Sequence, residues 1–295
     1  MQLDMRGLYR RLEEINYIGE EENIFTVFLA LRLQKPLLIE GAPGVGKTEM
    51  GKALAEVFGA ELIRLQCYEG LDENKALYEW NYQKQLLAIQ MSKELGVQDL
   101  DTADLFTMDY LLQRPLLKAI RSTEKAVLLI DEVDKCDHEF EAFLFEVLSD
   151  FQVSIPELGT IKARQIPIVV LTSNSERELS DGLRRRCIYL YLDFPSVERE
   201  IKIINRRVPE ARGRLAEEIA RTISVLRENG HIQKKPSIAE TIDWARALVS
   251  LGHDRLDATL IQNSLGVLLK SKRDQQIFKE EVDVEMLWRR VGERS

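Results

Sequence analysis

Residues 37–48 read Leu-Leu-Ile-Glu-Gly-Ala-Pro-Gly-Val-Gly-Lys-Thr. The short apolar run 37–40, which Pro36 opens, is typical of a strand buried on both faces. A helical pattern follows over residues 47–58. Between the two, residues 41–48 match the pattern G-x-x-x-x-G-K-[ST] throughout. The segment therefore predicts a strand, a phosphate-binding loop and a helix in direct succession.

The residue types in this loop are those that binding of a phosphate requires. Gly41, Gly44 and Gly46 let the backbone curl around a phosphate without Cβ clashes. The exposed N–H groups and the helix N-terminus then face the anion. Lys47 can reach the β- and γ-phosphates, and the Thr48 hydroxyl can bind Mg²⁺. A chance glycine-rich turn is the alternative, and the flanking strand and helix argue against it.

Two carboxylates follow the most strongly apolar run of the chain, residues 126–130. Ligands of open α/β sheets bind beyond the carboxyl ends of the strands, which is where Asp131 and Glu132 stand. We expect Asp131 to hold Mg²⁺, directly or through water, and Glu132 to polarise the attacking water as a general base. The alternative is a pair of surface carboxylates that cap the next helix.

A polar tip, Thr-Ser-Asn, follows another apolar run at residues 168–171. Asn174 could lie between the γ-phosphate and Glu132 and help to position the water. Taken alone, however, Asn174 is better explained as the start of a turn or as a cap of the helix expected at Glu176.

Three consecutive arginines, Arg184, Arg185 and Arg186, precede a strand pattern at residues 188–192. They could form a solvated basic turn, since a helix C-terminus favours cations. They could instead include an arginine finger, a cation directed at the γ-phosphate of a neighbouring subunit. A nucleic-acid patch is the weakest interpretation, because the whole chain carries a net charge of −8.

Strand and helix patterns alternate up to about Asp193, which predicts a parallel, doubly wound α/β sheet of about five strands. Beyond residue 195 we expect only helices, so the predicted domains are a core over 1–195 and a helical lid over 196–295. Within the core we expect a helix with an insertion at about 68–100, a helix at 110–123 and a hairpin at about 151–166. The lid helices are expected at 197–208, 214–229, 237–251, 256–271 and 280–291.

Composition limits the class of protein. The chain has 295 residues, with 41 Lys and Arg against 49 Asp and Glu, so broad binding to a phosphate backbone is disfavoured. Its three cysteines are odd in number and far apart, which indicates inert thiols in a reducing compartment. No apolar run approaches the roughly 20 residues of a membrane span, and the N-terminus lacks a signal-peptide pattern. We expect a cytoplasmic protein with no direct membrane span.

The motifs GAPGVGKT, LLIDE, LTSN and LRRR, followed by a helical domain, occur in an order that resembles AAA+ ATPases. Arg-Leu-Gln-Cys at 64–67 before a long insertion is similar to the helix-2 insert of the MoxR group, and the hairpin at 151–166 is similar to its pre-sensor-1 hairpin. The stretches YEGLDENKALYEWNYQKQLL, FEVLSDFQVSIPELGTI and KKPSIAETIDWARAL look most like the ATPases that help to mature molybdenum-containing carbon monoxide dehydrogenases.

The resemblance implies an ATP-hydrolysing, Mg²⁺-dependent ring, most often a hexamer, which works with a partner carrying a von Willebrand factor A domain on a metalloenzyme client. It makes Asn174 a sensor 1 and Arg186 the finger, with Arg185 as the second candidate. The predicted nucleotide-binding residues are Gly41, Ala42, Pro43, Gly44, Val45, Gly46, Lys47, Thr48 and Asp131, together with Tyr17 and Ile18 beside Gly19. The predicted catalytic residues are Glu132, Asn174, Arg186 and Arg185, and the predicted Mg²⁺ ligands are Thr48 and Asp131.

One position departs from the group. Where its members carry a sensor-2 arginine early in a lid helix, Pro236-Ser237-Ile238 is followed here by Ala239. We therefore assign no sensor 2, although Lys234, Lys235 or Arg246 could substitute.

Other functions stay open at this point: a nucleic-acid-dependent AAA+ motor, or a nucleotide-gated binding module with little turnover. The histidines lack paired metal-ligand spacing, which argues against a zinc site. Trp244 and Trp288 are simplest as core residues. Tyr78, Trp80 and Tyr82 could grip a client or pack locally, and packing is slightly favoured.

Overall fold

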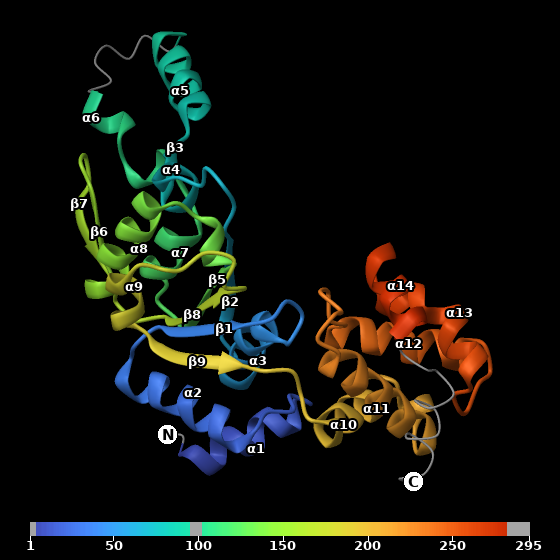
Figure 1. Cartoon of the computed structure of the whole chain (residues 1–295). Helices are drawn as coiled ribbons and strands as arrows, with labels where there is room; N and C mark the ends of the chain where they lie inside the picture. The colour runs from blue at the N-terminus through green and yellow to red at the C-terminus, as the bar shows by residue number, and fades with distance from the viewer. Residues whose placement is uncertain (1–3, 95–101, 282–295) are drawn as a thin grey trace. The chain divides into compact units, whose positions relative to one another are not determined.

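The computed structural model describes residues 4–94 and 102–281 (Figure 1). The chain divides into two compact units, one of Met1–Gly41 with Lys47–Leu192 and the other of Ala42–Gly46 with Asp193–Ser295. The predicted domain limits differ from this division at Ala42–Gly46 and at residues 193–195.

A five-stranded parallel sheet forms the centre of the first unit. Its strands are β1 (Leu37–Gly41), β2 (Glu61–Gln66), β5 (Ala126–Asp131), β8 (Ile168–Ser173) and β9 (Ile188–Leu192), in the spatial order β2-β5-β8-β1-β9. Every neighbouring pair in this sheet is parallel. The predicted α/β fold with about five strands is confirmed.

Helices cover both faces of this sheet, because alternate residues of each strand point to opposite sides. Leu128 and Ile130 of β5 join the core formed with α7 (Pro115–Arg121), α8 (His138–Asp150) and α9 (Asp181–Arg186). On the other face, the side chain of Leu129 lies so close to Gly51 of α3 (Lys47–Phe58) that a Cβ there would be 3.0 Å from it. The remaining helices of the first unit's amino-terminal part, α1 (Met5–Glu14) and α2 (Glu21–Leu33), pack against α3 and β9 respectively.

The insertion is folded differently from the prediction. Instead of one interrupted helix, residues 68–94 form α4 (Glu73–Ala76), strand β3 (Tyr78–Trp80) and α5 (Tyr82–Glu94), and residues 95–100 lie outside the described part. The helix predicted at 110–123 is also wrong in its first turn. Residues 108–110 form a short 3-10 helix and Leu111–Gln113 form strand β4, which pairs antiparallel with β3. The helix α7 starts only at Pro115, whose missing N–H suits a first helical position.

The aromatic residues of the insertion separate into two groups. Trp80 is 8% exposed and packs edge-on against Phe106, and Tyr78 packs edge-on against Trp80. Tyr82 is 61% exposed. Local packing is therefore the role of the first two rings but not of the third, which belongs to the first residue of α5. Helices α5 and α6 (Thr102–Leu105) both lie at the end of the first unit away from the sheet (Figure 1).

The hairpin predicted at 151–166 is present but shorter, as β6 (Gln152–Ile155) and β7 (Gly159–Lys162). Strand β8 is longer than predicted, because it includes Thr172 and Ser173. These two polar residues are fully buried, at 1% and 0% exposure, and so belong to the sheet rather than to a loop.

Helices alone make up the described part of the second unit that follows β9. They are α10 (Val197–Arg207), α11 (Arg214–Glu228), α12 (Ile238–Ser250), α13 (Ala258–Leu268) and α14 (Lys272–Glu281), with a 3-10 turn at Pro209–Ala211. Helix α14 was not predicted as a separate helix. The helix predicted at 280–291 lies outside the described residues from 282 on, as does Trp288, and so stays a prediction. Trp244 is fully buried and donates to Ser264 Oγ at 2.8 Å, as expected of a core residue.

A buried ion pair joins three helices of this second unit. The Arg227 guanidinium of α11 donates two hydrogen bonds, 2.6 and 2.9 Å long, to the Glu200 carboxylate of α10. The Thr241 hydroxyl of α12 donates to the same carboxylate at 2.8 Å. Glu200 is 1% exposed, and desolvation raises its pKa while the nearby guanidinium opposes that rise. The pair holds α10, α11 and α12 together, because either buried charge would be strongly destabilising without its partner.

Candidate nucleotide-binding site

Three neighbouring parallel strands, β1, β8 and β5, end at the same edge of the sheet, where the predicted site residues stand. The loop after β1 leads into α3, as the sequence predicts. Gly44 and Gly46 have φ angles of 75° and 100°, in the left-handed region that favours glycine. The pattern of glycines therefore reflects backbone conformations that other residues adopt at a cost.

The Lys47 ammonium is held inside this edge rather than extended into solvent. Its Nζ donates to Gly41 O at 2.6 Å and to Asn174 Oδ1 at 2.8 Å, and the residue is 6% exposed. Desolvation lowers the pKa of Lys47, and the carboxylates of Asp134, Asp131 and Glu132 partly offset this. A desolvated ammonium surrounded by oxygens is suited to an anionic phosphate.

The Asp131 carboxylate is fully engaged. Thr48 Oγ1 donates to Asp131 Oδ1 at 2.9 Å, and Thr172 Oγ1 donates to the same oxygen at 2.5 Å. Arg64 Nη2 lies 2.5 Å from Asp131 Oδ2. Hydroxyl and carboxylate oxygens are the ligands that Mg²⁺ takes, and the predicted pair Thr48 and Asp131 is brought together, so these residues fit that ion.

Glu132 has an unusual backbone and a restrained side chain. Its φ of 59° and ψ of 50° lie in the left-handed region, and its N–H donates to Thr172 Oγ1 at 2.9 Å. Its Oε2 accepts from Gln66 Nε2 at 3.0 Å and lies 2.8 Å from Lys135 Nζ. Strained conformations of this kind cluster at functional sites. The carboxylate has a defined position beside Asp131.

Asn174 is oriented by an aspartate that the sequence reasoning missed. Asp134 Oδ2 accepts hydrogen bonds from the backbone N–H groups of Asn174 and Glu176, each 3.0 Å long. Asp134 is 4% exposed, and its other carboxylate oxygen has no hydrogen-bond partner among the described residues. The signal that could have revealed Asp134 is a third acidic residue in Asp-Glu-Val-Asp, directly after the buried strand. Gln66, Arg64 and Thr172 were also missed as site residues.

The three arginines of the run differ in their contacts and exposure. Arg184 lies 3.5 Å from Glu40 and over the Tyr189 ring, which ties it to the sheet. Arg185 and Arg186 are exposed and form no ion pair within the described part of the chain. The guanidinium carbon of Arg186 lies 5.0 Å from the centre of the Phe145 ring.

Tyr17 and Ile18 follow α1, where the N–H of Tyr17 donates to Leu12 O at 2.8 Å. Their assignment to the nucleotide site stays a prediction.

The three thiols are buried away from solvent. Cys67, Cys136 and Cys187 are free and buried, and burial raises the pKa of Cys187 to about 12. In the described ranges, no group of three or more His, Cys, Asp or Glu side chains could hold a metal ion. Across the same ranges, no helix has both the length and the apolar character required to cross a membrane.

The strand, the glycine loop, the buried lysine and the acidic pair define a P-loop nucleotide-binding protein. The sequence pattern of the AAA domain (dynein-related subfamily) matches residues 36–187, and the chain belongs to that family. This family consists of nucleotide-hydrolysing ATPases, which use ATP with Mg²⁺.

The chain is also similar to several known proteins, all at low sequence identity. The chain is 23% identical over 282 residues to an uncharacterised protein of Staphylococcus haemolyticus, covering 91% of this chain and 97% of that protein. It is 28% identical over 185 residues to the chaperone protein ClpB of Aquifex aeolicus, and 32% identical over 113 residues to Midasin of Giardia intestinalis. It spans only 15% and 2% of the lengths of those two proteins.

The same fold occurs in the RuvB Holliday junction branch migration motor of Thermotoga maritima. The TM-score is 0.51 at 19% identity, covering 92% of this chain and 78% of that chain.

Proposed function

We propose that this protein hydrolyses ATP with Mg²⁺ and uses the energy to remodel a protein client. The observation that carries the hydrolysis step is the presence of two hydrogen-bonded pairs, Lys47 with Asn174 and Thr48 with Asp131, at one edge of the sheet. Nucleotide contacts and charge stabilisation supply most of the catalysis in phosphoryl transfer, so a pre-arranged set of this kind suits it.

In the proposed reaction, a water molecule attacks the γ-phosphorus, and the bond to the oxygen that bridges the β- and γ-phosphates breaks. Glu132 accepts the proton of that water, and Asn174 orients the water. Lys47 neutralises charge on the β- and γ-phosphates. Thr48 and Asp131 would hold Mg²⁺, which when bound would supply further neutralisation of charge on the phosphate oxygens. The products are ADP and inorganic phosphate.

We further propose that active sites form between copies of the chain in a ring, in which Arg186 or Arg185 reaches the γ-phosphate bound by a neighbour. The support is that both side chains are exposed and without an ion pair in the described residues, whereas Arg184 is held by Glu40. A hexamer is the ring size that the family resemblance suggests.

For the client, we propose a metalloenzyme whose maturation or cofactor assembly requires remodelling, with a molybdenum hydroxylase as the specific candidate and a von Willebrand factor A domain protein as the partner. The likeness to MoxR-group sequences motivates this choice, and the similarity to ClpB chaperones suits a protein client. Helix α5 carries four exposed apolar side chains, Tyr82, Leu86, Leu87 and Met91, which could contact such a client. We propose a cytoplasmic location, or membrane association through partners.

The second candidate is a nucleic-acid-dependent motor, because the branch migration motor RuvB shares the fold. The net charge of −8 disfavours phosphate tracking, and the region of the hairpin β6–β7 carries Asp150 and Glu157 as well as Lys162 and Arg164. An ATPase rate that nucleic acid leaves unchanged at low salt would discard this candidate.

The central experiment mixes two inactive variants, Glu132→Gln and Arg186→Ala. Rings that contain one interface with intact Glu132 and intact Arg186 should recover part of the ATPase activity. Arg10→Ala, which removes an exposed arginine of α1, is the matched control and should be fully active by itself. The same mixing experiment is then repeated with Arg185→Ala in place of Arg186→Ala. If neither mixture recovers activity at any ratio, the intersubunit finger is ruled out. Wild-type turnover by Glu132→Gln would contradict its role as the base.

A further inference from the structure

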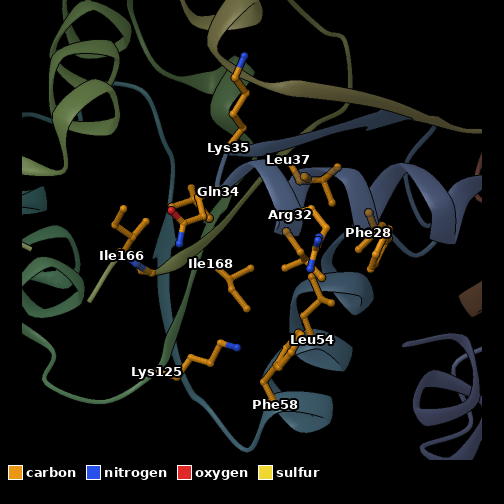
Figure 2. A pocket seen from close by; sticks show the side chains of 15 residues that line it. Phe28, Arg32, Gln34, Lys35, Leu37, Leu54, Phe58, Lys125, Ile166 and Ile168 are labelled. Carbon is orange, nitrogen blue, oxygen red and sulfur yellow. The ribbon is translucent and has the colours of Figure 1, made fainter. Parts of the chain in front are cut away.

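A cavity of about 220 Å³ lies at the edge of the sheet opposite to the nucleotide site (Figure 2). Its lining includes the residues just before or at the start of three strands, namely Lys125 before β5, Leu37 of β1 and Ile168 of β8. The carboxyl ends of the same strands carry the phosphate loop, Asp131 and Asn174. Helix α3 also begins at the nucleotide site with Lys47 and reaches the cavity with Phe58.

The walls of this cavity are apolar and come from α2, α3 and the strand starts. Their apolar members are Val27, Phe28, Ala30, Leu31, Leu37, Leu54, Phe58, Ile166, Pro167, Ile168 and Val169. Apolar walls with a few polar groups are the usual composition of small-molecule sites. The volume is below the roughly 300–1,000 Å³ of pockets for drug-sized ligands, so any occupant is small.

The charged residues that line the cavity all have one sign. They are Arg32, Lys35 and Lys125, and the remaining polar side chain is that of Gln34, so the lining contains no carboxylate. Within residues 4–94 and 102–281, none of the three cations forms an ion pair.

Two of these cations lie against the aromatic walls. The Lys125 ammonium is 3.8 Å from the centre of the Phe58 ring, and the Arg32 guanidinium carbon is 5.9 Å from that of the Phe28 ring. Figure 2 shows Lys125 extended toward Phe58, while Lys35 points away from the other labelled side chains. Partial burial lowers the pKa of Lys125, although Lys125 and Arg32 are both exposed overall.

We propose that this cavity binds a small apolar carboxylate, whose hydrocarbon part contacts the apolar walls and whose anionic group pairs with Lys125 and Arg32. An apolar body is favoured by the wall composition, and a negative charge by the two unpaired cations. A zwitterion is disfavoured, because its cation would meet no carboxylate in the lining. Nothing in the proposed hydrolysis of ATP uses these residues, so the site is separate from the nucleotide site.

The test compares octanoate with octanol, its neutral analogue, by isothermal titration calorimetry on the full chain. Octanoate should bind saturably and at least about tenfold more tightly than octanol, because a charge-assisted contact accounts for the difference. Lys125→Gln and Arg32→Gln should each weaken octanoate binding severalfold or more and leave octanol binding unchanged. Lys162→Gln, which removes an exposed lysine of β7, is the matched control and should bind octanoate as the wild type does.

The variant Lys47→Ala, which removes the cation of the phosphate loop, tests whether octanoate binds in the cavity or at the nucleotide site. This variant should bind octanoate normally. Loss of octanoate binding there would assign the carboxylate to the nucleotide site and overturn the proposal. Equal affinity for octanol and octanoate, no saturable binding, or unchanged binding by both cavity variants would also overturn it. Melting temperatures of all variants, measured without ligand, separate lost binding from lost folding.

Discussion

The Lys47 ammonium donates to Asn174 Oδ1 at 2.8 Å, although the two residues are 127 positions apart in the chain. The contact joins the start of α3 to the end of β8, and so links the residue proposed to bind phosphate to the one proposed to position water. The proposed water-positioning residue therefore also contacts the proposed phosphate-binding lysine.

The first prediction concerns Asn174→Ala. ATP affinity should change less than about threefold, because Lys47 keeps its bond to Gly41 O, while turnover should fall by about 10²-fold or more as the water loses its orientation. Fluorescent nucleotide titration and phosphate-release assays measure the two effects. Ser175→Ala, which changes the neighbouring side chain, is the control. Unchanged turnover in Asn174→Ala would remove Asn174 from the reaction.

The second prediction concerns pH. The pKa of Lys47 is lowered from its ordinary value of 10.5, so the folded chain releases this proton at a lower pH than the unfolded chain. Protonated Lys47 therefore costs stability at neutral pH. The cost shrinks as the pH rises above the folded-state pKa and is gone only above the unfolded value of 10.5. The same deprotonation removes a cation from the phosphate site, so ATP affinity should fall in that alkaline range. Lys47→Arg should bind ATP with a flatter alkaline profile, since its guanidinium stays charged.

Asp134 gives the third prediction. Asp134→Ala leaves two partly buried N–H groups without their acceptor, and we expect a loss of about 1–2 kcal/mol in unfolding free energy. It also removes the carboxylate that most strongly opposes the lowering of the Lys47 pKa, so the alkaline loss of ATP affinity should begin at lower pH. A purely structural role would lower stability without moving that pH profile. Asp134→Asn retains an acceptor and should recover part of the stability.

Arg64 gives the fourth prediction. Its guanidinium neutralises Asp131 Oδ2 and also donates to Gln66 Oε1 at 2.6 Å, beside the contact between Gln66 and Glu132. Arg64→Gln should make Asp131 more available to a cation, and the Mg²⁺ concentration that half-saturates ADP binding should fall severalfold. Calorimetry of ADP binding at varied Mg²⁺ measures this without turnover, and Arg64→Lys, which keeps a cation, is the control. A higher Mg²⁺ requirement in Arg64→Gln would show that Arg64 assists the ion instead of competing with it.

The sequence predicted those features that are encoded by residues close together in the chain. The apolar run before Asp131 and the glycine loop before Lys47 each carry a local pattern, and the parallel sheet follows from the alternation of such patterns. Asp134, Gln66 and Arg64 were missed because their partners are distant in sequence and their own residue types are common on surfaces. The strands β3 and β4 were missed because three residues are too few to show a period of two. Thr172 looked like a loop residue because a buried hydroxyl is recognisable only from its partner.

The last prediction concerns the helical unit, where Arg227 pairs with Glu200 at 6% and 1% exposure. Arg227→Met leaves a buried carboxylate without its cation, and we expect a loss of about 3–5 kcal/mol in unfolding free energy at neutral pH. Arg212→Met, which removes an exposed arginine of the same unit, should change stability by less than about 0.5 kcal/mol.

The pH dependence separates the lost charge pair from lost packing. The pKa of Glu200 is already raised by burial, and losing Arg227 should raise it further. A carboxyl group whose folded-state pKa exceeds its unfolded value favours the folded chain below the unfolded value of about 4.5, and this contribution is lost as the pH rises through the folded-state pKa. The deficit of Arg227→Met should therefore shrink as the pH is lowered from 7 toward 5. The double variant Glu200→Gln with Arg227→Met should be more stable at pH 7 than Arg227→Met alone. Urea denaturation at several pH values measures both effects, and a deficit independent of pH would mean that packing, not charge, is lost.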